Sequence, residues 1–323
     1  MPTWATILFV LLGAGWALAA ARHTLHLRAL RDLPPLNEPG AGRPPSVAVV
    51  IAARDEAGHI ETAVRSFLRQ DGVNLRVIVA DDRSQDATPE IIRRLAGEDA
   101  RVEHARIDAL PGGWLGKCHA LRAGAERAEG AEWIVFADAD TELLAPDAVG
   151  RAVACARAEG ADHLCLLPRM PARTRWARAL TVSFYIGALD RLDGLNRDGR
   201  RGYFGVGAFS LVRADAYRAA GGHEPLRLEV LDDVNLGALM RRAGGRSRAR
   251  LARDAVATTW GGSVPELLAV LEKNTFAAAG YRVWVMALVV LIFVVFWGAA
   301  VAGPIVAALT GAVAALAPTV GLA

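Results

Sequence analysis

Short apolar runs alternate with amphipathic stretches through the middle of the chain. The apolar runs are residues 46–52 (SVAVVIA), 75–80 (LRVIVA), 132–137 (EWIVFA) and 162–167 (DHLCLL). Runs of this length and β-branched content predict strands that are buried on both faces. Helical periodicity lies between them, at 58–70, 88–97, 117–128 and 146–158. The alternation predicts an α/β fold with a mostly parallel sheet and flanking helices.

Both ends of the chain are apolar, because no Asp, Glu, Lys or Arg precedes Arg22 or follows Arg282. Residues 3–21 are long enough to cross a bilayer as a helix, which takes about 20 residues. Basic residues follow this segment, at Arg22, Arg28 and Arg31, and the positive-inside rule then places the main domain in the cytoplasm. The sequence ALAAA leaves a cleaved signal peptide as an alternative interpretation.

The uncharged C-terminal segment covers residues 283–323, and Gly303-Pro304 predicts its division into two spans, 283–302 and 304–321. The predicted organisation is a transmembrane helix at 1–22, a linker at 23–44, a soluble-type domain at 45–282 and a C-terminal transmembrane region at 283–323. The predicted location is the inner (cytoplasmic) membrane, in a multi-pass protein whose main domain faces the cytoplasm.

Composition narrows the class of protein further. Hydrophobic residues make up 53 % of the 323 residues and the mean hydropathy is +0.25, which excludes a disordered chain. The net charge of +3 is too small to indicate a nucleic-acid partner, and we expect none. Three cysteines without paired spacing, Cys118, Cys155 and Cys165, exclude a disulfide framework and a cysteine-based zinc site.

Carboxylates follow three of the predicted strands. Residues 53–56 (ARDE) follow the first strand without the glycines of a dinucleotide-binding loop, which makes NAD or FAD unexpected. Asp81-Asp82 follows the second strand, and Asp138-Ala139-Asp140 follows the third. Because the carboxyl ends of parallel strands meet at one edge, these groups should line one cleft. Asp138 and Asp140 could present oxygens to one divalent cation bridging a diphosphate. The alternative is that these residues cap turns and helices.

At these residues the chain resembles family 2 glycosyltransferases of the GT-A fold, over about 45–280. The resemblance is carried by six segments in the order of the family: VAVVIAARDEAGHI, VIVADDRSQDAT, GWLGKCHAL, WIVFADADTEL, GYFGVGAFSLVRADAYRAAGG and EVLDDVNLGALMRRAG. With its apolar ends, the chain is similar to the members that glycosylate lipids, and most similar to the hopanoid-associated group.

The resemblance implies roles for particular residues. The nucleotide would lie against Ala53, Arg54, Glu56 and Asp82, and Asp138 and Asp140 match the motif that holds Mn²⁺ or Mg²⁺ with the diphosphate. Asp233 matches the catalytic base. The family usually has Glu-Asp where this chain has Asp232-Asp233, so which carboxylate points into the site stays open. Because the pair opens a helical stretch at 233–243, we expect the helix N-terminus to lower its pKa.

Lys117 is one of only two lysines, against 35 arginines. A compact ammonium suits a phosphate or a sugar hydroxyl, so we count Lys117 among the candidate donor-binding residues. The alternative is an incidental surface lysine at the start of a helix. Residues 202–207 (GYFGVG) would let the backbone approach a ligand closely, or would form a plain bend.

The sequence therefore predicts a membrane-anchored, metal-assisted, inverting glycosyltransferase with Asp233 as general base. It would move one sugar from a nucleotide sugar, most often a UDP-sugar in this family, to a hydroxyl of a lipid or hopanoid. The Q-x-x-R-W motif of processive members is absent at 272–276 (EKNTF), which favours transfer of a single sugar. The alternatives are a sugar-phosphate or nucleotidyl transferase on the same fold and a membrane-tethered, nucleotide-binding scaffold without activity.

Overall fold

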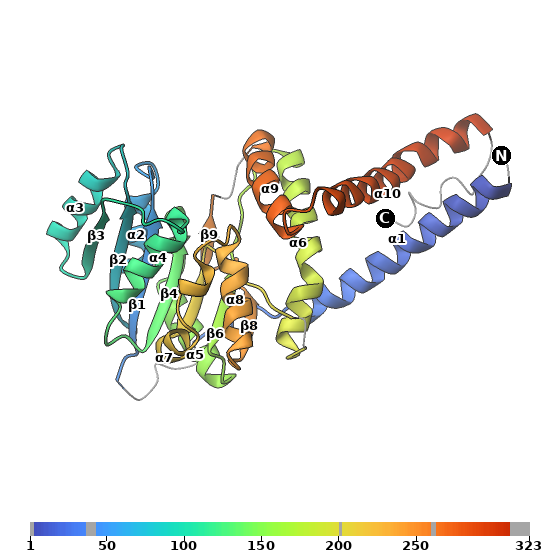
Figure 1. The fold of residues 1–323 in the computed structure, drawn as a ribbon. Helices are drawn as coiled ribbons and strands as arrows, with labels where there is room; N and C mark the ends of the chain where they lie inside the picture. The colour runs from blue at the N-terminus through green and yellow to red at the C-terminus, as the bar shows by residue number, and fades with distance from the viewer. Residues whose placement is uncertain (1–2, 37–42, 200–201, 260–262, 311–323) are drawn as a thin grey trace. The chain divides into compact units, whose positions relative to one another are not determined.

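The computed structural model describes residues 3–36, 43–199, 202–259 and 263–310 (Figure 1). The chain divides into two compact units, one formed by Leu30–Val270 and the other by Met1–Ala29 with Leu271–Ala323. The larger unit carries the predicted sheet and all the candidate site residues.

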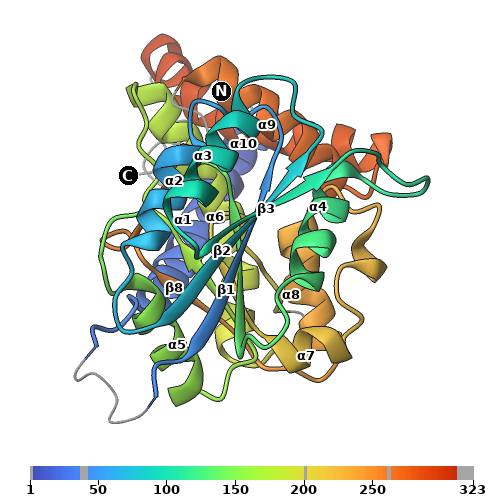
Figure 2. The same cartoon turned by 90° about the vertical axis from the view of Figure 1, so that its left-hand side faces the viewer.

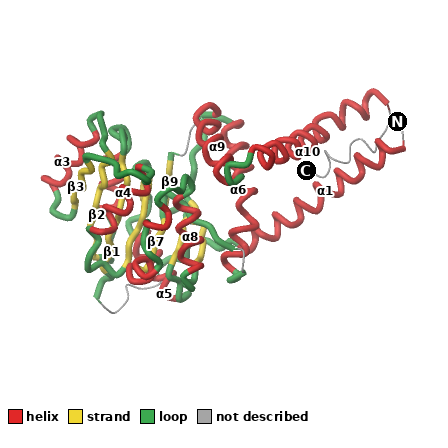
Figure 3. The backbone as a smooth tube through the Cα atoms, in the orientation of Figure 1, coloured by secondary structure: helices red, strands yellow, loops and turns green. Residues whose placement is uncertain are grey.

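The larger unit is built on a seven-stranded sheet in the order β3-β2-β1-β4-β7-β6-β8. Its strands are β1 (Ser46–Ala53), β2 (Asn74–Asp82), β3 (Val102–Ile107), β4 (Trp133–Asp138), β6 (His163–Leu167), β7 (Ser210–Arg213) and β8 (Ser247–Leu251). Only β7 runs antiparallel to its neighbours, which confirms the mostly parallel sheet. Two short strands, β5 (Thr141–Leu143) and β9 (Val256–Thr258), pair separately. Figure 3 shows the strands side by side with helices on their flanks.

Helices cover both faces of this sheet. They are α2 (Ile60–Leu68), α3 (Thr88–Glu98), α4 (Gly116–Glu126), α5 (Ala148–Ala158), α6 (Arg175–Asn196), α7 (Ala214–Ala219) and α8 (Asp232–Arg242), with a 3-10 turn at Glu224–Leu226. Alternate residues of β1 explain the two layers, since Val49 and Ile51 join the core under α2, α3 and α5, while Val50 joins the core under α4, α7 and α8. Figure 2 looks along the sheet between these two helix layers.

The four predicted strands are confirmed as β1, β2, β4 and β6, and the predicted helices are confirmed as α2 to α5 and, for residues 233–243, as α8. The strand β3, with the sequence VEHARI, was not predicted. It lies at the edge of the sheet, where only Val102, Ala105 and Ile107 need to be buried, so it lacks a continuous apolar run.

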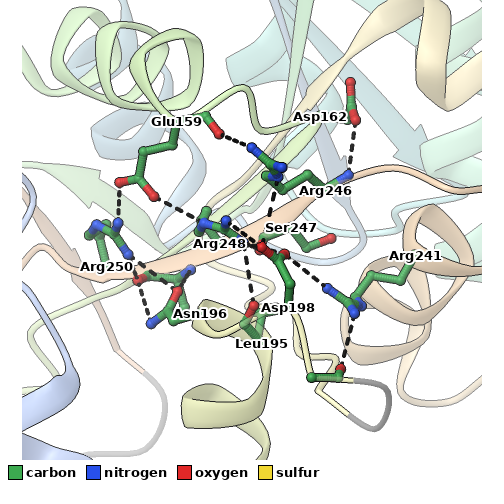
Figure 4. A network of polar contacts seen from close by, with 12 residues as sticks. Glu159, Asp162, Leu195, Asn196, Asp198, Arg241, Arg246, Ser247, Arg248 and Arg250 are labelled. Carbon is green, nitrogen blue, oxygen red and sulfur yellow. Dashed lines mark hydrogen bonds and ion pairs between the residues drawn. The ribbon is translucent and has the colours of Figure 1, made fainter.

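The opposite edge strand, β8, is held by a cluster of arginines (Figure 4). Arg248 donates to both carboxylate oxygens of Asp198, at 2.7 and 2.9 Å, and to Oε2 of Glu159 at 3.0 Å. Arg250 pairs with Oε1 of the same Glu159. Because Asp198 follows α6 and Glu159 follows α5, these contacts fix β8 to the ends of two helices.

The predicted linker 23–44 is not one element. Its first residues belong to the helix α1 (Thr3–Ala29), whereas Leu33 is 2 % exposed in the core of the larger unit. Asp32 forms a bridge with Leu251, and the buried Arg151 donates to the carbonyl oxygens of Leu33 and Pro34. Residues 37–42 of this stretch lie outside the described residues.

The smaller unit contains α1 and α10 (Val283–Thr310), with Trp16 and Trp297 in edge-to-face contact at 5.2 Å. Within the described residues, Thr6–Arg28 is the one helix that is long and apolar enough by itself to cross a membrane; α10 meets the same criterion only as a bent pair with α9 (Val264–Ala278). The predicted break at Gly303-Pro304 is wrong, because α10 continues through both residues to Thr310. A proline removes one backbone donor, and an apolar helix can tolerate that loss. The rest of the predicted second span, from residue 311 on, lies outside the described residues.

Candidate active site

The predicted site residues of β1, β2 and β4 come together at the carboxyl edge of the sheet. Ala53 pairs with Asp81 in the ladder between β1 and β2, and Asp138 pairs with Ala52 between β4 and β1. Parallel strands that end level with one another bring their following loops into one cleft. The convergence that the sequence predicted is therefore present in the fold.

Hydrogen bonds join the loop after β1 to the loop after β2. The backbone N–H of Asp55 donates to Oγ of Ser84 at 3.0 Å, and that of Gln85 donates to Oδ1 of Asp55 at 2.7 Å. Asp55 and Arg83 both have positive φ angles, 57° and 60°, which non-glycine residues adopt only where other contacts fix the loop. Arg54 is exposed in this loop and lies 4.0 Å from the Asp55 carboxylate. These loops are rigid enough to offer a fixed surface to a ligand.

The two aspartates at the end of β2 have different surroundings. Asp81 accepts hydrogen bonds from Ser84, His104 and Arg106, which outweigh its burial and hold its pKa below the ordinary value. Asp82 is 3 % exposed and is clamped by the guanidinium of Arg83 at 2.8 Å. Asp81 thus ties β2 to the loop after it and to β3, whereas the carboxylate of Asp82 is paired with Arg83 next to the start of α4.

The first residue of α4 explains how that helix approaches the cleft. A Cβ atom on Gly116 would lie 2.2 Å from Oδ2 of Asp82, closer than real contacts allow. Glycine is required here so that the helix can start against the carboxylate. The close approach also places the next residue, Lys117, at the cleft.

Lys117 bridges two of the predicted acidic residues. Its Nζ lies 2.7 Å from Oδ1 of Asp138 and 3.4 Å from Oδ1 of Asp232. Burial alone would lower the pKa of Lys117, but the charges of Asp138, Asp232 and Asp233 hold it well above its ordinary value. Lys117 is thus a fixed cation between β4 and α8, which explains why one of only two lysines in the chain stands here.

Asp233 is held by the backbone of the glycine-rich segment. Its Oδ2 accepts a hydrogen bond from the N–H of Gly207 at 2.8 Å. A Cβ atom on Gly205 would lie 1.8 Å from the carbonyl oxygen of Asp233, and one on Gly207 would lie 2.3 Å from Oδ2 of Asp138. Gly205 and Gly207 therefore let the backbone lie against Asp233 and Asp138, which a plain bend would not require.

The expected lowering of the pKa at the start of α8 is wrong. Burial, followed by the negative charge of Asp232, raises the pKa of Asp233 to about 7. Burial also raises the pKa of Asp232, although Lys117 opposes this. Loss of hydration and repulsion between neighbouring carboxylates outweigh the attraction of the helix N-terminus. A carboxyl group with a pKa near neutrality suits proton transfer.

Asp140 and Glu56 form the acidic side of the cleft. Oδ2 of Asp140 accepts hydrogen bonds from Oγ1 of Thr258 and from the N–H of Thr259, both at 3.0 Å. Burial, and then the charge of Asp138, nevertheless raise the pKa of Asp140. Burial likewise raises the pKa of Glu56, with further contributions from Asp140 and Asp138 that a hydrogen bond from His59 opposes. Negative charge here is only partly compensated.

This charge distribution fits a divalent cation. Asp138 and Asp140 supply hard carboxylate oxygens, and a cation would relieve the repulsion that raises the pKa of Asp140 and of Glu56. Within the part of the chain that the structure describes, no three His, Cys, Asp or Glu side chains form a metal-binding group on their own. The remaining ligands would have to come from a bound substrate and water, as is usual for Mg²⁺.

A small cavity of about 10 Å³ lies between β4, α4 and α8. Lys117, Asp138, Asp232 and Asp233 line it together with His223. Neither His223 nor Thr258 was among the residues predicted from the sequence. The only sequence signals were the glycine pair before His223 and the threonine pair at 258–259, and neither indicates a site without the fold.

A mostly parallel sheet that gathers carboxylates and one lysine at its carboxyl edge is typical of α/β enzymes that bind ligands there. Residues 48–221, more than half of the chain, match the family model of Glycosyl transferase family 2, and the chain belongs to this family. The predicted resemblance to family 2 and the GT-A type of α/β fold are thereby confirmed.

The chain is similar in sequence to two named bacterial proteins. The chain is 37 % identical over 129 residues to the succinoglycan biosynthesis protein ExoO of Rhizobium meliloti (strain 1021), covering 39 % of this chain and 34 % of that protein. It is 27 % identical over 194 residues to a 4,4'-diaponeurosporenoate glycosyltransferase of Staphylococcus aureus (strain bovine RF122 / ET3-1), covering 59 % of this chain and 50 % of that one. The chain thus spans a third to a half of the length of these relatives.

Solved structures share the fold. A mannosyltransferase, PcManGT from Pyrobaculum calidifontis, in complex with GDP-Man and Mn²⁺, has a TM-score of 0.58 at 18 % identity and covers 98 % of both chains. TarS of S. aureus has a TM-score of 0.50 at 15 % identity, covering 66 % of this chain and 36 % of that chain. At these identities the likeness shows the fold alone.

Proposed function

We propose that this protein is an inverting glycosyltransferase that moves one sugar from a nucleoside diphosphate sugar to a hydroxyl group of a lipid. The observation that carries the proposal is the pair of unlike carboxylates at the start of α8. Asp232 is paired with the ammonium of Lys117 at 3.4 Å, whereas Asp233 is held by a backbone N–H and has a pKa raised to about 7. Asp233 is therefore the carboxylate available to take a proton from an acceptor hydroxyl.

The donor would lie across the loops after β1, β2 and β4. The nucleotide would lie beside Arg54, Glu56 and Asp82, at the loops after β1 and β2 that hydrogen bonds join. Asp138 and Asp140 would hold Mn²⁺ or Mg²⁺, which neutralises charge on the leaving diphosphate when bound. Lys117, fixed beside Asp138, would place a further positive charge at the phosphates. UDP is the predicted nucleotide, but the PcManGT complex holds GDP-Man, so both bases need to be tested.

The proposed lipid acceptor and the proposed membrane attachment are supported by the apolar helices α1 and α10. The apolar helix α1 and the Arg22, Arg28 and Arg31 that follow residues 3–21 support anchoring to the inner membrane with the larger unit in the cytoplasm. Apolar side chains of α10 are exposed, among them Val283, Leu291 and Ile292. A glycosyltransferase at a bilayer would meet lipid hydroxyls directly, and one sequence relative is a diaponeurosporenoate glycosyltransferase. A hopanoid hydroxyl is the acceptor that the sequence resemblance favours.

The test measures sugar transfer and nucleotide binding on the same preparations. The 323-residue chain in detergent is incubated with UDP- and GDP-sugars, Mn²⁺ and a bacterial lipid extract, and radiolabelled glycolipid is counted. Asp233→Asn should lower transfer by about 10²–10⁴-fold and leave nucleotide binding intact. Asp138→Ala should abolish metal-dependent binding. Asp215→Asn is the matched control, because Asp215 is exposed at the start of α7.

Each outcome decides between the candidate functions. Transfer that is lost in Asp233→Asn and kept in Asp215→Asn supports the proposal. A scaffold would show nucleotide binding without transfer in any preparation. Transfer that survives in Asp233→Asn at the wild-type rate would contradict the role of Asp233 as base. Nucleotide binding by Asp138→Ala that still depends on the metal would remove Asp138 from the metal site.

A further inference from the structure

His223 carries a buried imidazole and lines the small cavity of the candidate active site. It is 1 % exposed, and its Nε2 is a buried atom without a hydrogen-bond partner among the described residues. Gly221 and Gly222 precede it with φ angles of 91° and 61°, a turn that directs the chain back toward β4. The ring lies edge-to-face with Phe136 of β4, with ring centroids 4.8 Å apart.

The other ring nitrogen is fixed by Tyr217. The Tyr217 hydroxyl lies 2.6 Å from Nδ1 of His223, and both side chains are buried. Burial raises the pKa of Tyr217, so the phenol keeps its proton and can donate it to Nδ1. A neutral imidazole that accepts at Nδ1 carries its own proton on Nε2. Burial, and then the charge of Lys117, lower the pKa of His223 to about 3, which keeps the ring neutral at pH 7.

The unpartnered Nε2 belongs to a residue that lines a small cavity. His223 lines the cavity of about 10 Å³ together with Lys117, Asp138, Asp232 and Asp233. Asp232 is 6 % exposed, and its side-chain partner among the described residues is Lys117, at 3.4 Å. A volume of this size is about what a single water molecule requires. Unpaired polar groups around such a space are usually satisfied by an ordered water.

We propose that His223 is a positioning residue that holds one water molecule in this cavity, donating to it from Nε2, and that the water donates in turn to the carboxylate of Asp232. The water link keeps the Asp232 carboxylate in place against Lys117. Lys117 then stays beside Asp138, and Asp233 pairs with neither Lys117 nor the water. The inference rests on the proposed function, because it explains how the two carboxylates of α8 take different roles.

Two substitutions at one position separate the donor from the ring. His223→Phe keeps a flat ring beside Phe136 and removes the Nε2–H, while His223→Gln keeps an amide N–H that can reach the water. We expect His223→Phe to lower kcat about tenfold or more with less than a twofold change in KM for the nucleotide sugar. His223→Gln should recover kcat to within about threefold of the wild type. Thermal melting of each variant checks folding.

The tautomer is measured independently of activity. The ¹⁵N spectrum of the histidine-labelled chain, compared with that of His223→Gln, assigns the two ring nitrogens of His223. We expect a protonated Nε2 and an unprotonated, hydrogen-bonded Nδ1 in the wild type, and a loss of this preference in Tyr217→Phe. This measurement stands even if no substrate for transfer is found, so it separates failure of this inference from failure of the proposed function.

The outcomes that would overturn the inference are specific. A proton on Nδ1 in the wild type would mean that Nε2 cannot donate into the cavity. Equal kcat losses in folded His223→Phe and His223→Gln would show that the ring acts by packing alone. An unchanged kcat in folded His223→Phe would remove His223 from the site altogether.

Discussion

Replacing Gly207 by alanine perturbs both carboxylates of the proposed reaction at once. The N–H of Gly207 donates to Asp233 at 2.8 Å, and its carbonyl accepts from the N–H of Asp138 at 2.9 Å. A Cβ atom here would lie 2.3 Å from Oδ2 of Asp138, whereas ordinary contacts begin at 3.4 Å. One of the two groups must therefore move by about 1 Å. A displacement of this size at a catalytic group costs on the order of 10²-fold in rate, or about 2.7 kcal/mol.

The assay is the rate of nucleoside diphosphate release at saturating nucleotide sugar. The matched control is Gly112→Ala, because a Cβ on Gly112 meets nothing within 4 Å and its φ is not positive. We expect Gly207→Ala to fall about 10²-fold and Gly112→Ala to stay within twofold of the wild type. If Gly207→Ala keeps activity within threefold while melting normally, the close approach of this backbone to Asp138 has no part in the reaction.

Three further predictions concern the surroundings of the site and the edge of the sheet. Burial and then the charge of Asp232 raise the pKa of Asp233 to about 7, so activity should fall as the pH drops through about 7. Asp232→Asn should move this limb of the kcat/KM profile to lower pH, and a shift to higher pH would contradict the coupling between the two carboxylates. Lys117→Arg should lower turnover about tenfold despite the retained charge, because a planar guanidinium cannot place one nitrogen 2.7 Å from Asp138 and 3.4 Å from Asp232; steady-state kinetics that match the wild type would refute this. Arg248→Met should lower the free energy of unfolding by about 2 kcal/mol and the melting temperature by about 5 °C, because it removes the guanidinium that pairs with both Asp198 and Glu159. An unchanged melting curve would show that the arginine cluster on β8 is not stabilising.

The strands that are buried on both faces were predictable, because burial on both faces requires a continuous run of apolar residues. Residues 46–52 and 132–137 are central strands with helices on both faces, so nearly every position is apolar. The edge strand β3 is buried only at Val102, Ala105 and Ile107, and the polar residues Glu103, His104 and Arg106 interrupt its apolar pattern. Residues 30–36 looked like a linker because their attachment to β8 depends on backbone hydrogen bonds, which leave no side-chain pattern.

The candidate site was predictable as a set of residue types at strand ends, but not as a set of interactions. Asp82, Asp138 and Asp140 follow strands of a parallel sheet, and topology alone brings them together. The sign of the pKa change at Asp233 was wrong, because a rule for one helix end ignores burial and the neighbouring Asp232. His223 could not be found from the sequence, since its cavity exists only where α4, α8 and β4 meet.

The measurement that tests the account most directly is calorimetric titration of UDP and of GDP into the 323-residue chain, with Mn²⁺ and then with EDTA. The account predicts binding of at least one nucleotide at one site per chain, present with the metal and lost with the chelator. Absence of binding for both nucleotides, with Mn²⁺ and with Mg²⁺, in a chain that melts cooperatively would contradict a metal-assisted donor site at Asp138 and Asp140.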